Sequence, residues 1–268
     1  MSRLSARFEA LKAAKKKALI PFITAGDPNP SVTVNLLHDM VDAGASVLEL
    51  GVPFSDPMAE GPVIQAACER ALLHNVSLTD VLEMVKEFRT KDADTPIVLM
   101  GYLNPVEVMG YETFADAAAD AGVDGLILVD LPPEEGEDLI SALKARQIDP
   151  IFLLAPTSTD ERMKVICENA SGFVYYVSLK GVTGAANLDV DSVVEKVKQI
   201  RTHTSIPVGV GFGIRDAATA ARVAAVADAV VVGSAVVKRV AENADDAEKI
   251  SQQVCELLSS MRKAMDEL

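Results

Sequence analysis

The sequence predicts an α/β protein in which residues 1–268 form one (β/α)8 barrel domain. Eight short apolar, β-branched runs alternate along the chain with longer segments of helical period. The runs begin about 30 residues apart, which is the size of one βαβ repeat. No Pro/Gly/Ser-rich linker or low-complexity stretch separates them. An open, doubly wound sheet is the alternative, but eight evenly spaced units favour a closed barrel.

The expected strands are mostly continuous apolar runs rather than alternating ones. Continuous runs are typical of parallel strands that are covered on both faces. In chain order, strands are expected at 18–24, 46–52, 96–102, 125–131, 150–155, 172–178, 206–211 and 228–232.

Helices are expected between the strands, and several of their starts carry a capping residue. Ser31 precedes an apolar run of helical period, and Ser77 followed by Asp80 has the spacing of a capping box. Asp216 precedes an alanine-rich helix. An apolar stripe from Ile250 to Met265 predicts a final helix that closes the fold.

An additional helix is expected near the beginning of the sequence. Leu4, Phe8 and Leu11 recur at i, i+4 and i+7, which predicts an amphipathic helix. We expect this helix to pack on the barrel rather than to anchor a membrane. No stretch approaches the roughly 20 apolar residues that a membrane-spanning helix needs.

The composition excludes several classes of protein. Twenty-five Lys and Arg residues against 39 Asp and Glu residues give a net charge of −14, which would repel nucleic-acid phosphates. Cys68, Cys167 and Cys255 lie far apart without metal-binding spacing, so neither a disulfide framework nor a zinc site is indicated. A reduced, cytoplasmic location is therefore expected.

Glycine-rich loops after the last two expected strands predict an anion site. Residues 211–213 and the pair Gly233-Ser234 each lead into a helix, whose N-terminal N–H groups bind anions. Barrels frequently hold a phosphate at these two loops, and Gly184 could supply another donor. The alternative is that the glycines only form tight turns. We expect a barrel of the phosphate-binding type, with an N-terminal helix and extra helices.

Two acidic residues are the main catalytic candidates. Glu49 lies inside an apolar strand, where burial costs several kcal/mol and raises the carboxyl pKa toward neutral pH. Glu60, in the loop that follows, supplies a second carboxylate at the same mouth, so the pair could divide acid and base roles. The alternatives are a structural buried carboxylate and a solvated loop residue. Asp56 and Asp130 on the same rim are equally well explained as turn formers.

Neither metal nor cofactor chemistry is indicated. His38, His74 and His203 fall in helices or an outer loop, so no metal site is expected at the strand ends. The sequence contains no P-loop, no GxSxG and no dinucleotide motif that opens the first helix. Lys180 could form a Schiff base, but a lid residue is the favoured reading. These residues support cofactor-free acid–base chemistry on a phosphorylated small molecule.

Five segments together resemble one family across essentially the whole chain. They are LELGVPFSDPMAEGPVIQ at 48–65, PFITAGDP at 21–28, GVTGA at 181–185, GVGFGI at 209–214 and GSAVVK at 233–238. Each is similar to the corresponding segment of the tryptophan synthase alpha chain family. The resemblance implies a lyase that cleaves indole-3-glycerol phosphate by a retro-aldol reaction into indole and D-glyceraldehyde 3-phosphate.

The resemblance also implies roles for individual residues. Glu49 would protonate C3 of the indole, Glu60 would engage the indole N–H, and Tyr175 would line the pocket close to both. Thr183 would also belong to a lid. The implied lining of the indole slot is Phe22, Met100, Tyr102, Ile127, Leu153, Thr183 and Phe212, and the implied phosphate site is Gly184, Gly213, Gly233 and Ser234.

The sequence departs from the family pattern at two places. Residue 60 is Glu where better-known members carry Asp, and displacing a catalytic carboxylate by about 1 Å can cost about a hundredfold in rate. Leu179-Lys180 stands where some members have Arg-Ser, which bears on contacts of the lid.

The resemblance further implies a cytoplasmic α2β2 heterotetramer in which indole passes through a tunnel to a beta chain that makes L-tryptophan. Pyridoxal phosphate would belong to the beta chain, and this chain would bind no cofactor. The implied contact positions on the rim are Pro53, Phe54, Asp56, Asn104, Asp130 and Pro132.

Two alternative functions stay open at this point. The chain could be a sugar-phosphate isomerase or epimerase on the same barrel, although the missing histidine ligands speak against one. Alternatively, Glu60 could have disabled the site, leaving a subunit that mainly activates its beta partner.

Overall fold

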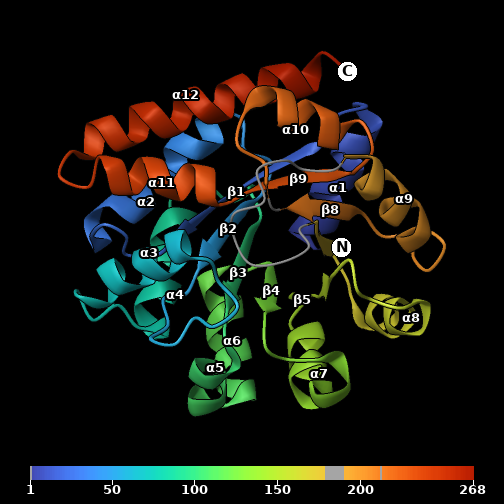
Figure 1. The fold of residues 1–268 in the computed structure, drawn as a ribbon. Coiled ribbons are helices and arrows are strands. Elements are labelled where there is room, and N and C mark those ends of the chain that lie inside the picture. The colour runs from blue at the N-terminus through green and yellow to red at the C-terminus, as the bar shows by residue number, and fades with distance from the viewer. Residues whose placement is uncertain (1, 179–189, 212) are drawn as a thin grey trace.

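Parallel strands occupy the centre of the molecule, and helices surround them (Figure 1). The computed structural model describes residues 2–178, 190–211 and 213–268. All of the strand pairs in the sheet are parallel, in the order β5-β4-β3-β2-β1-β9-β8-β7-β6. The strands are β1 Ala18–Thr24, β2 Leu48–Gly51, β3 Ile97–Gly101, β4 Gly125–Leu128, β5 Asp149–Ile151, β6 Leu153–Leu154, β7 Val174–Val177, β8 Val208–Gly211 and β9 Ala229–Val232.

The sheet closes because its first and last members belong to one stretch of chain. β5 pairs with β4, β6 pairs with β7, and only Phe152 separates β5 from β6. The prediction of one uninterrupted strand at 150–155 is wrong, since this stretch pairs with its two neighbours in succession. The carbonyl of Phe152 still accepts a hydrogen bond from the Tyr175 N–H at 3.0 Å, so the ladder is continuous there. The predicted (β/α)8 barrel is therefore confirmed, with its fifth strand in two segments.

Side chains along each strand alternate between the barrel interior and the layer beneath the helices. Ile20, Val98 and Ile127 pack together in the interior. Their sequence neighbours, such as Leu19 and Leu99, pack in the outer core against the helices. Both faces of the strands are buried, as the continuous apolar runs predict.

Helices fill the connections between strands and shield the outer face of the barrel (Figure 1). They are α1 Arg3–Ala13, α2 Pro30–Asp42, α3 Pro62–Leu72, α4 Leu78–Arg89, α5 Leu103–Met109, α6 Tyr111–Ala121, α7 Glu137–Ala145, α8 Asp160–Asn169, α9 Val190–Ile200, α10 Ala217–Ala224, α11 Ser234–Glu242 and α12 Ala247–Asp266, with a short 3₁₀ helix at Pro133–Glu135. No helix in the described ranges is long and apolar enough to cross a membrane.

The helix caps confirm two predictions and correct a third. Ser77 and Asp80 form the expected capping box, and Asp216 caps α10. Ser31 does not cap α2, because the helix begins at Pro30 and its N-cap is Asn29. Asn29 Oδ1 accepts a hydrogen bond from the Ser31 N–H at 3.1 Å, and Pro30 occupies the first helical position, which suits its fixed φ.

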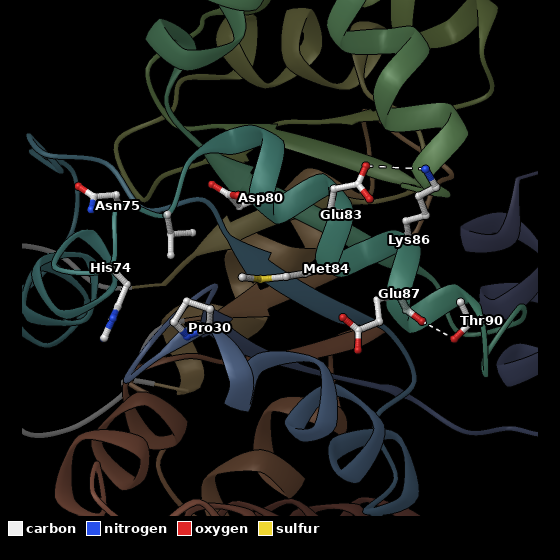
Figure 2. Close-up of a pocket in the computed structure, with 10 residues that line it drawn as sticks. Pro30, His74, Asn75, Asp80, Glu83, Met84, Lys86, Glu87 and Thr90 are labelled. Carbon is white, nitrogen blue, oxygen red and sulfur yellow. Dashed lines mark hydrogen bonds and ion pairs between the residues drawn. The ribbon is translucent and has the colours of Figure 1, made fainter.

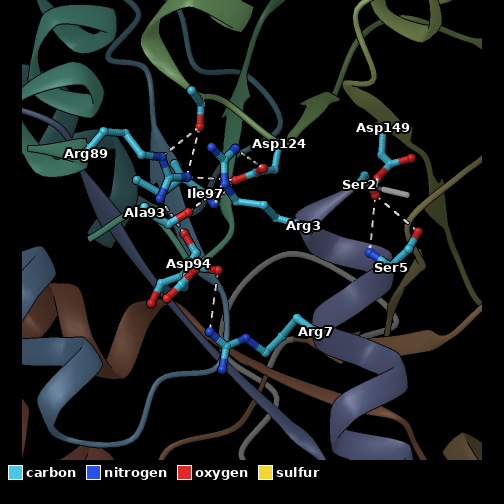
Figure 3. Close-up of polar contacts among 12 residues, drawn as sticks. Ser2, Arg3, Ser5, Arg7, Arg89, Ala93, Asp94, Ile97, Asp124 and Asp149 are labelled. Carbon is cyan, nitrogen blue, oxygen red and sulfur yellow. Dashed lines mark hydrogen bonds and ion pairs between the residues drawn. The ribbon is translucent and has the colours of Figure 1, made fainter. Parts of the chain in front are cut away.

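α1 covers the N-terminal end of the barrel, as its apolar stripe predicts. Leu4 is fully buried, and the ring of Phe8 packs 5.8 Å from that of Phe173 between ring centroids. Ser2 also donates a hydrogen bond to Asp149 at 2.6 Å (Figure 3). Because α1 occupies this end, the strands present their open mouth at the C-terminal end, where barrel enzymes place their active sites.

Asp124 ties α1 to the barrel through a buried set of polar contacts (Figure 3). Its side chain is 3% exposed. It accepts hydrogen bonds from Arg3, Arg89 and the Ile97 N–H, each at 2.8 Å. These donors come from α1, α4 and β3, so one carboxylate joins three elements.

We predict that Asp124→Asn lowers the free energy of unfolding by about 3 kcal/mol, because it leaves two guanidinium groups facing a neutral amide. Urea unfolding of the variant and the wild type measures this difference. Asp120→Asn, on the exposed face of α6, is the matched control and should change stability by less than about 0.5 kcal/mol. Equal stability of all three proteins would contradict the role assigned to Asp124.

Candidate active site

Glu49 is a buried carboxylate on the inner face of β2. It lies in register with Phe22 on β1 and Val98 on β3, and it is 1% exposed. Glu49 Oε2 has no hydrogen-bond partner among the described residues. Burial raises the pKa of Glu49 to about 8, with a further contribution from the charge of Glu60. At neutral pH this carboxyl group therefore holds a proton that it can donate.

Glu60 and Tyr175 face the same space as Glu49. Glu60 lies in the turn before α3, and burial raises its pKa to about 7. Tyr175, on β7, is 6% exposed, and its pKa is raised well above 10 by burial and then by the charges of Glu49 and Glu60. The charge of Glu60 raises the pKa of both Glu49 and Tyr175, which indicates that the three side chains lie near one another. Two carboxyl groups with different raised pKa values can serve as an acid and a base near neutral pH.

Gly51, which was not among the predicted site residues, and Gly211, which was expected only in the glycine-rich anion loop, make room for aromatic side chains of the site. A Cβ atom on Gly51 would lie 2.6 Å from Cζ of Phe22. A Cβ atom on Gly211 would overlap the hydroxyl and ring of Tyr175. Only glycine allows these rings to lie flat against the neighbouring strands. Their position at strand ends, beside candidate residues of adjacent strands, is the signal that could have identified them.

An apolar surface lines the mouth next to the two carboxyl groups. Ile127 and Phe22 are buried, whereas Met100 and Leu153 are half-buried. Met100 packs both with the interior cluster that contains Ile127 and with a second cluster that contains Phe22. Tyr102 stacks on Phe54 with 5.0 Å between ring centroids. The predicted slot residues on β1, β3, β4 and β6 thus lie on one continuous wall.

The start of α11 lies beside this apolar wall. Gly233 is the N-cap of this helix, and because it has no side chain it leaves the first N–H groups of the helix without a side-chain acceptor from the cap. A Cβ atom on Gly233 would lie 3.9 Å from Cβ of Phe22. Ser234 is exposed, and Gly213 has φ +74°, a conformation that favours glycine. The N–H groups at a helix start lack intrahelical acceptors and suit an anion.

Three predicted site residues lie outside the described residues: Thr183, Gly184 and Phe212.

The rim of the mouth combines exposed acidic and apolar groups. Asp56, Asn104 and Asp130 are exposed, while Phe54 and Pro132 are half-buried and Pro53 is buried. Asp130 accepts a hydrogen bond from the Leu103 N–H at 2.9 Å, so it caps α5 rather than only shaping its own turn. Met58, on the same loop as Asp56, is 85% exposed.

Histidine and cysteine side chains are the remaining candidates for metal-binding or thiol chemistry. Within the described part of the chain, no three His, Cys, Asp or Glu side chains are placed to hold a metal ion. His38 stacks on Phe88, and His203 contacts Asp160 at 2.9 Å, both away from the mouth. Cys68, Cys167 and Cys255 are free thiols.

A groove of about 500 Å³ lies on the outer layer, between the start of α2 and α4 (Figure 2). It is lined by Pro30, His74 and Met84 together with charged side chains of α4. Glu83 and Lys86 pair across 3.7 Å, and Asp80 is engaged in its capping box. None of the residues that line this groove is a predicted site residue, so we place the site at the barrel mouth.

Comparison with known proteins gives consistent matches. A family model described as Tryptophan synthase alpha chain matches residues 8–266. The tryptophan synthase alpha chain of Thioalkalivibrio sulfidiphilus is 69% identical over 266 residues, covering 99% of this chain and 100% of the relative. The corresponding chain of Marinobacter nauticus is 60% identical over 268 residues, covering 100% and 99%. The crystal structure of tryptophan synthase subunit alpha from Legionella pneumophila has a TM-score of 0.93 at 47% identity and full coverage of both chains.

We predict that Glu49→Gln stabilises the protein at alkaline pH. The ordinary carboxyl pKa of 4.5 is raised to about 8 in the folded state, so the wild type loses stability as pH rises between these values. The variant lacks this loss. Its free energy of unfolding should match the wild type near pH 4.5 and exceed it above pH 8, by an amount on the order of a few kcal/mol.

Urea unfolding of the two proteins between pH 4.5 and pH 9 measures this difference. Glu9→Gln, on the exposed side of α1, is the control and should follow the wild type. A Glu49→Gln protein that is no more stable than the wild type above pH 8 would show that the carboxyl group is not desolvated.

Proposed function

This chain belongs to the tryptophan synthase alpha chain family, and from that premise we propose how its residues carry out the reaction. As a member, it is a lyase that cleaves indole-3-glycerol phosphate. The observation that carries our assignment of roles is the pair of carboxyl groups beside an apolar wall, the buried Glu49 and the half-buried Glu60, whose pKa values are raised to about 8 and about 7.

We assign the indole ring to the apolar wall and the phosphate to the glycine-rich end of the mouth. Phe22, Met100, Tyr102, Ile127 and Leu153 offer the planar, water-excluding surface that an indole ring requires. Gly213, Gly233 and Ser234 are proposed to hold the phosphate, through N–H groups at the start of α11. The glycerol chain would then cross the space beside Glu49, because Phe22 lies in register with Glu49 and beside Gly233.

Glu49 is proposed to act first as an acid and then as a base. It donates its proton to C3 of the indole, and the positive charge that develops on the ring is shared by the nitrogen. The electron pair of the bond between C3 and the glycerol carbon returns to the ring as that bond breaks. The ionised Glu49 takes the proton from the hydroxyl group on the glycerol carbon, which becomes the aldehyde of glyceraldehyde 3-phosphate. The carboxyl group of Glu49 is thereby restored.

Glu60 is proposed to accept a hydrogen bond from the indole N–H and to stabilise the positive charge that develops on the ring. A pKa of about 7 leaves a large share of Glu60 ionised at neutral pH. The apolar surroundings strengthen its interaction with that charge. Tyr175 lies close enough for the charges of both carboxyl groups to raise its pKa, and we propose that it limits the positions that they can adopt.

Membership of the family implies a beta-chain partner. We propose an α2β2 assembly that docks on the rim formed by Pro53, Phe54, Asp56, Asn104, Asp130 and Pro132 and makes L-tryptophan from the released indole. Aromatic stacking at Phe54 and the exposed Met58 give this rim the apolar character of a protein interface. Pyridoxal phosphate is assigned to the beta chain alone. The three free cysteines are compatible with a cytoplasmic location.

Release of indole from indole-3-glycerol phosphate tests this proposal, with EDTA present and with or without a beta chain. Slow release by the chain alone, faster release with beta and no effect of EDTA are expected. Failure of release under both conditions, with stimulation of beta activity, would establish a non-catalytic activating subunit instead.

We predict that Glu49→Gln folds and binds the beta chain but retains less than about one hundredth of wild-type turnover, because its amide cannot transfer the proton. Indole release in the presence of beta measures turnover, and co-sedimentation with beta measures binding. Glu9→Gln serves as the active control. Turnover above about one hundredth in Glu49→Gln would contradict the acid–base role.

We predict a narrow optimum of kcat/KM between about pH 7 and about pH 8. Activity should fall below this range as Glu60 gains a proton and above it as Glu49 loses one. The pH dependence of indole release measures both limbs. Replacement of Glu60 by Gln should remove the acidic limb and lower the maximum, whereas a profile that is flat from pH 6 to pH 9 would contradict the assignment.

A further inference from the structure

We infer that Gln65 is a positioning residue that orients Glu60 toward Glu49. This inference rests on the proposed role of Glu60 and extends it to a side chain that does not itself touch the substrate. It arises from the way the turn before α3 is held.

The turn that carries Glu60 has little support from regular structure. The Glu60 N–H donates to the Pro57 carbonyl at 3.1 Å, and the Met58 N–H donates to the Asp56 carbonyl at 2.7 Å. Met58 and Ala59 are exposed. These contacts close the turn upon itself but do not fix its direction relative to the barrel, although Glu60 must point inward to reach the buried site.

The side-chain amide of Gln65 connects this turn to α3. Its Nε2 donates to the carbonyl of Glu60 at 2.8 Å and lies 3.5 Å from the carbonyl of Pro57. Gln65 stands in the first turn of α3, where side chains lean back toward the helix N-terminus and so reach the preceding turn. Fixing the Glu60 carbonyl restricts the ψ angle of that residue and thus the direction in which its side chain leaves the backbone.

The opposite side of the same turn is held by Tyr102. The Ala59 N–H donates to the Tyr102 hydroxyl at 2.9 Å, so the barrel wall and α3 grip adjacent residues of the turn. Tyr102 already belongs to the proposed indole slot, so its replacement would alter two functions at once. Gln65 offers the cleaner test.

α3 is itself firmly placed, so Gln65 acts from a rigid base. Arg70, near the end of α3, donates to both carboxylate oxygens of the buried Asp27, at 2.6 and 2.9 Å. Ala67 and Cys68 on the same helix are buried against Phe22 and Val237. A residue anchored in this way can set the position of the turn next to it, whereas a glutamine on a loosely held segment could not.

The chemistry of the amide explains why glutamine suits this position. The acceptor is a carbonyl oxygen, so the side chain must donate, and it must do so without a charge that would alter the two carboxyl groups nearby. A glutamate at 65 has the same length but cannot donate when ionised, and it would place an additional negative charge close to Glu60. The placement of residue 60 matters because this chain carries Glu at that position. The carboxyl group of Glu lies one methylene farther from the backbone than that of Asp.

The test measures steady-state indole release by Gln65→Met in the complex with the beta chain. Methionine preserves the length of the side chain but cannot donate. A fall in kcat/KM of about tenfold to a hundredfold is expected, carried by kcat, with KM changed by less than about threefold. Gln253→Met on α12 is the matched control and should behave as the wild type. Gln65→Ala, which removes the same donor without adding a new side chain, is measured alongside.

A double-mutant cycle separates positioning from a general loss of structure. In the Glu60→Gln background, Gln65→Met should change kcat by less than about twofold, since there is no longer a carboxylate to orient. Losses that multiply in the double variant would overturn the inference, as would full activity of both Gln65→Met and Gln65→Ala.

The pH profile supplies a readout that a purely structural role would not move. Gln65→Glu adds a negative charge near Glu60, so the acidic limb of kcat/KM should move to higher pH. An unmoved limb would count against the proximity on which the inference depends. Full activity of Glu60→Gln alone would refute the proposed role of Glu60, whereas loss in Glu60→Gln without loss in Gln65→Met would refute only that of Gln65.

Discussion

Desolvation of Glu49 is the constraint on which the site depends. A strand of a closed barrel is apolar on both faces because helices cover one side and the packed interior fills the other. An acidic residue in such a strand keeps its proton near neutral pH, since ionisation would place a charge where water cannot reach it. The apolar wall, the neighbouring carboxyl group and the rings that pack beside it all maintain that condition. The fold thus converts an energetically unfavourable position into a usable acid.

The sequence alone predicted the architecture well because its signals are local. Continuous apolar runs mark buried parallel strands, and the i, i+4, i+7 stripe at Leu4, Phe8 and Leu11 marks the helix that covers one end. Glu49 stood out because a charged residue interrupts such a run. The wrong predictions concern details that depend on three-dimensional geometry. α2 begins at Pro30, so its N-cap is Asn29 rather than Ser31. Barrel closure divided the fifth strand at Phe152, because that stretch must pair with two different neighbours.

Other parts of the site could not be predicted because they depend on contacts between distant segments. Gly51 and Gly211 matter through the rings of Phe22 and Tyr175 on adjacent strands, and neither glycine reveals this from its own neighbours in sequence. Gln65 resembles an ordinary helical glutamine until its amide is seen against the Glu60 carbonyl. The family resemblance implied roles for the residues that are proposed to meet the substrate, but it implied none for the residues that we propose to hold those groups in place.

The position of α1 at the N-terminal end of the barrel affects how substrate enters and how products leave. Leu4 and Phe8 fill that end and the packed interior closes the barrel axis, so within the described part of the chain the strands can be reached from the opposite end. Substrate and products would then use the same end of the barrel, although the two products differ in polarity. A partner docked on the rim, as proposed above, would therefore control both the entry of the phosphorylated compound and the release of its two fragments. The direction in which the apolar product is transferred would then depend on the partner at this end of the barrel, rather than on a second passage through the barrel.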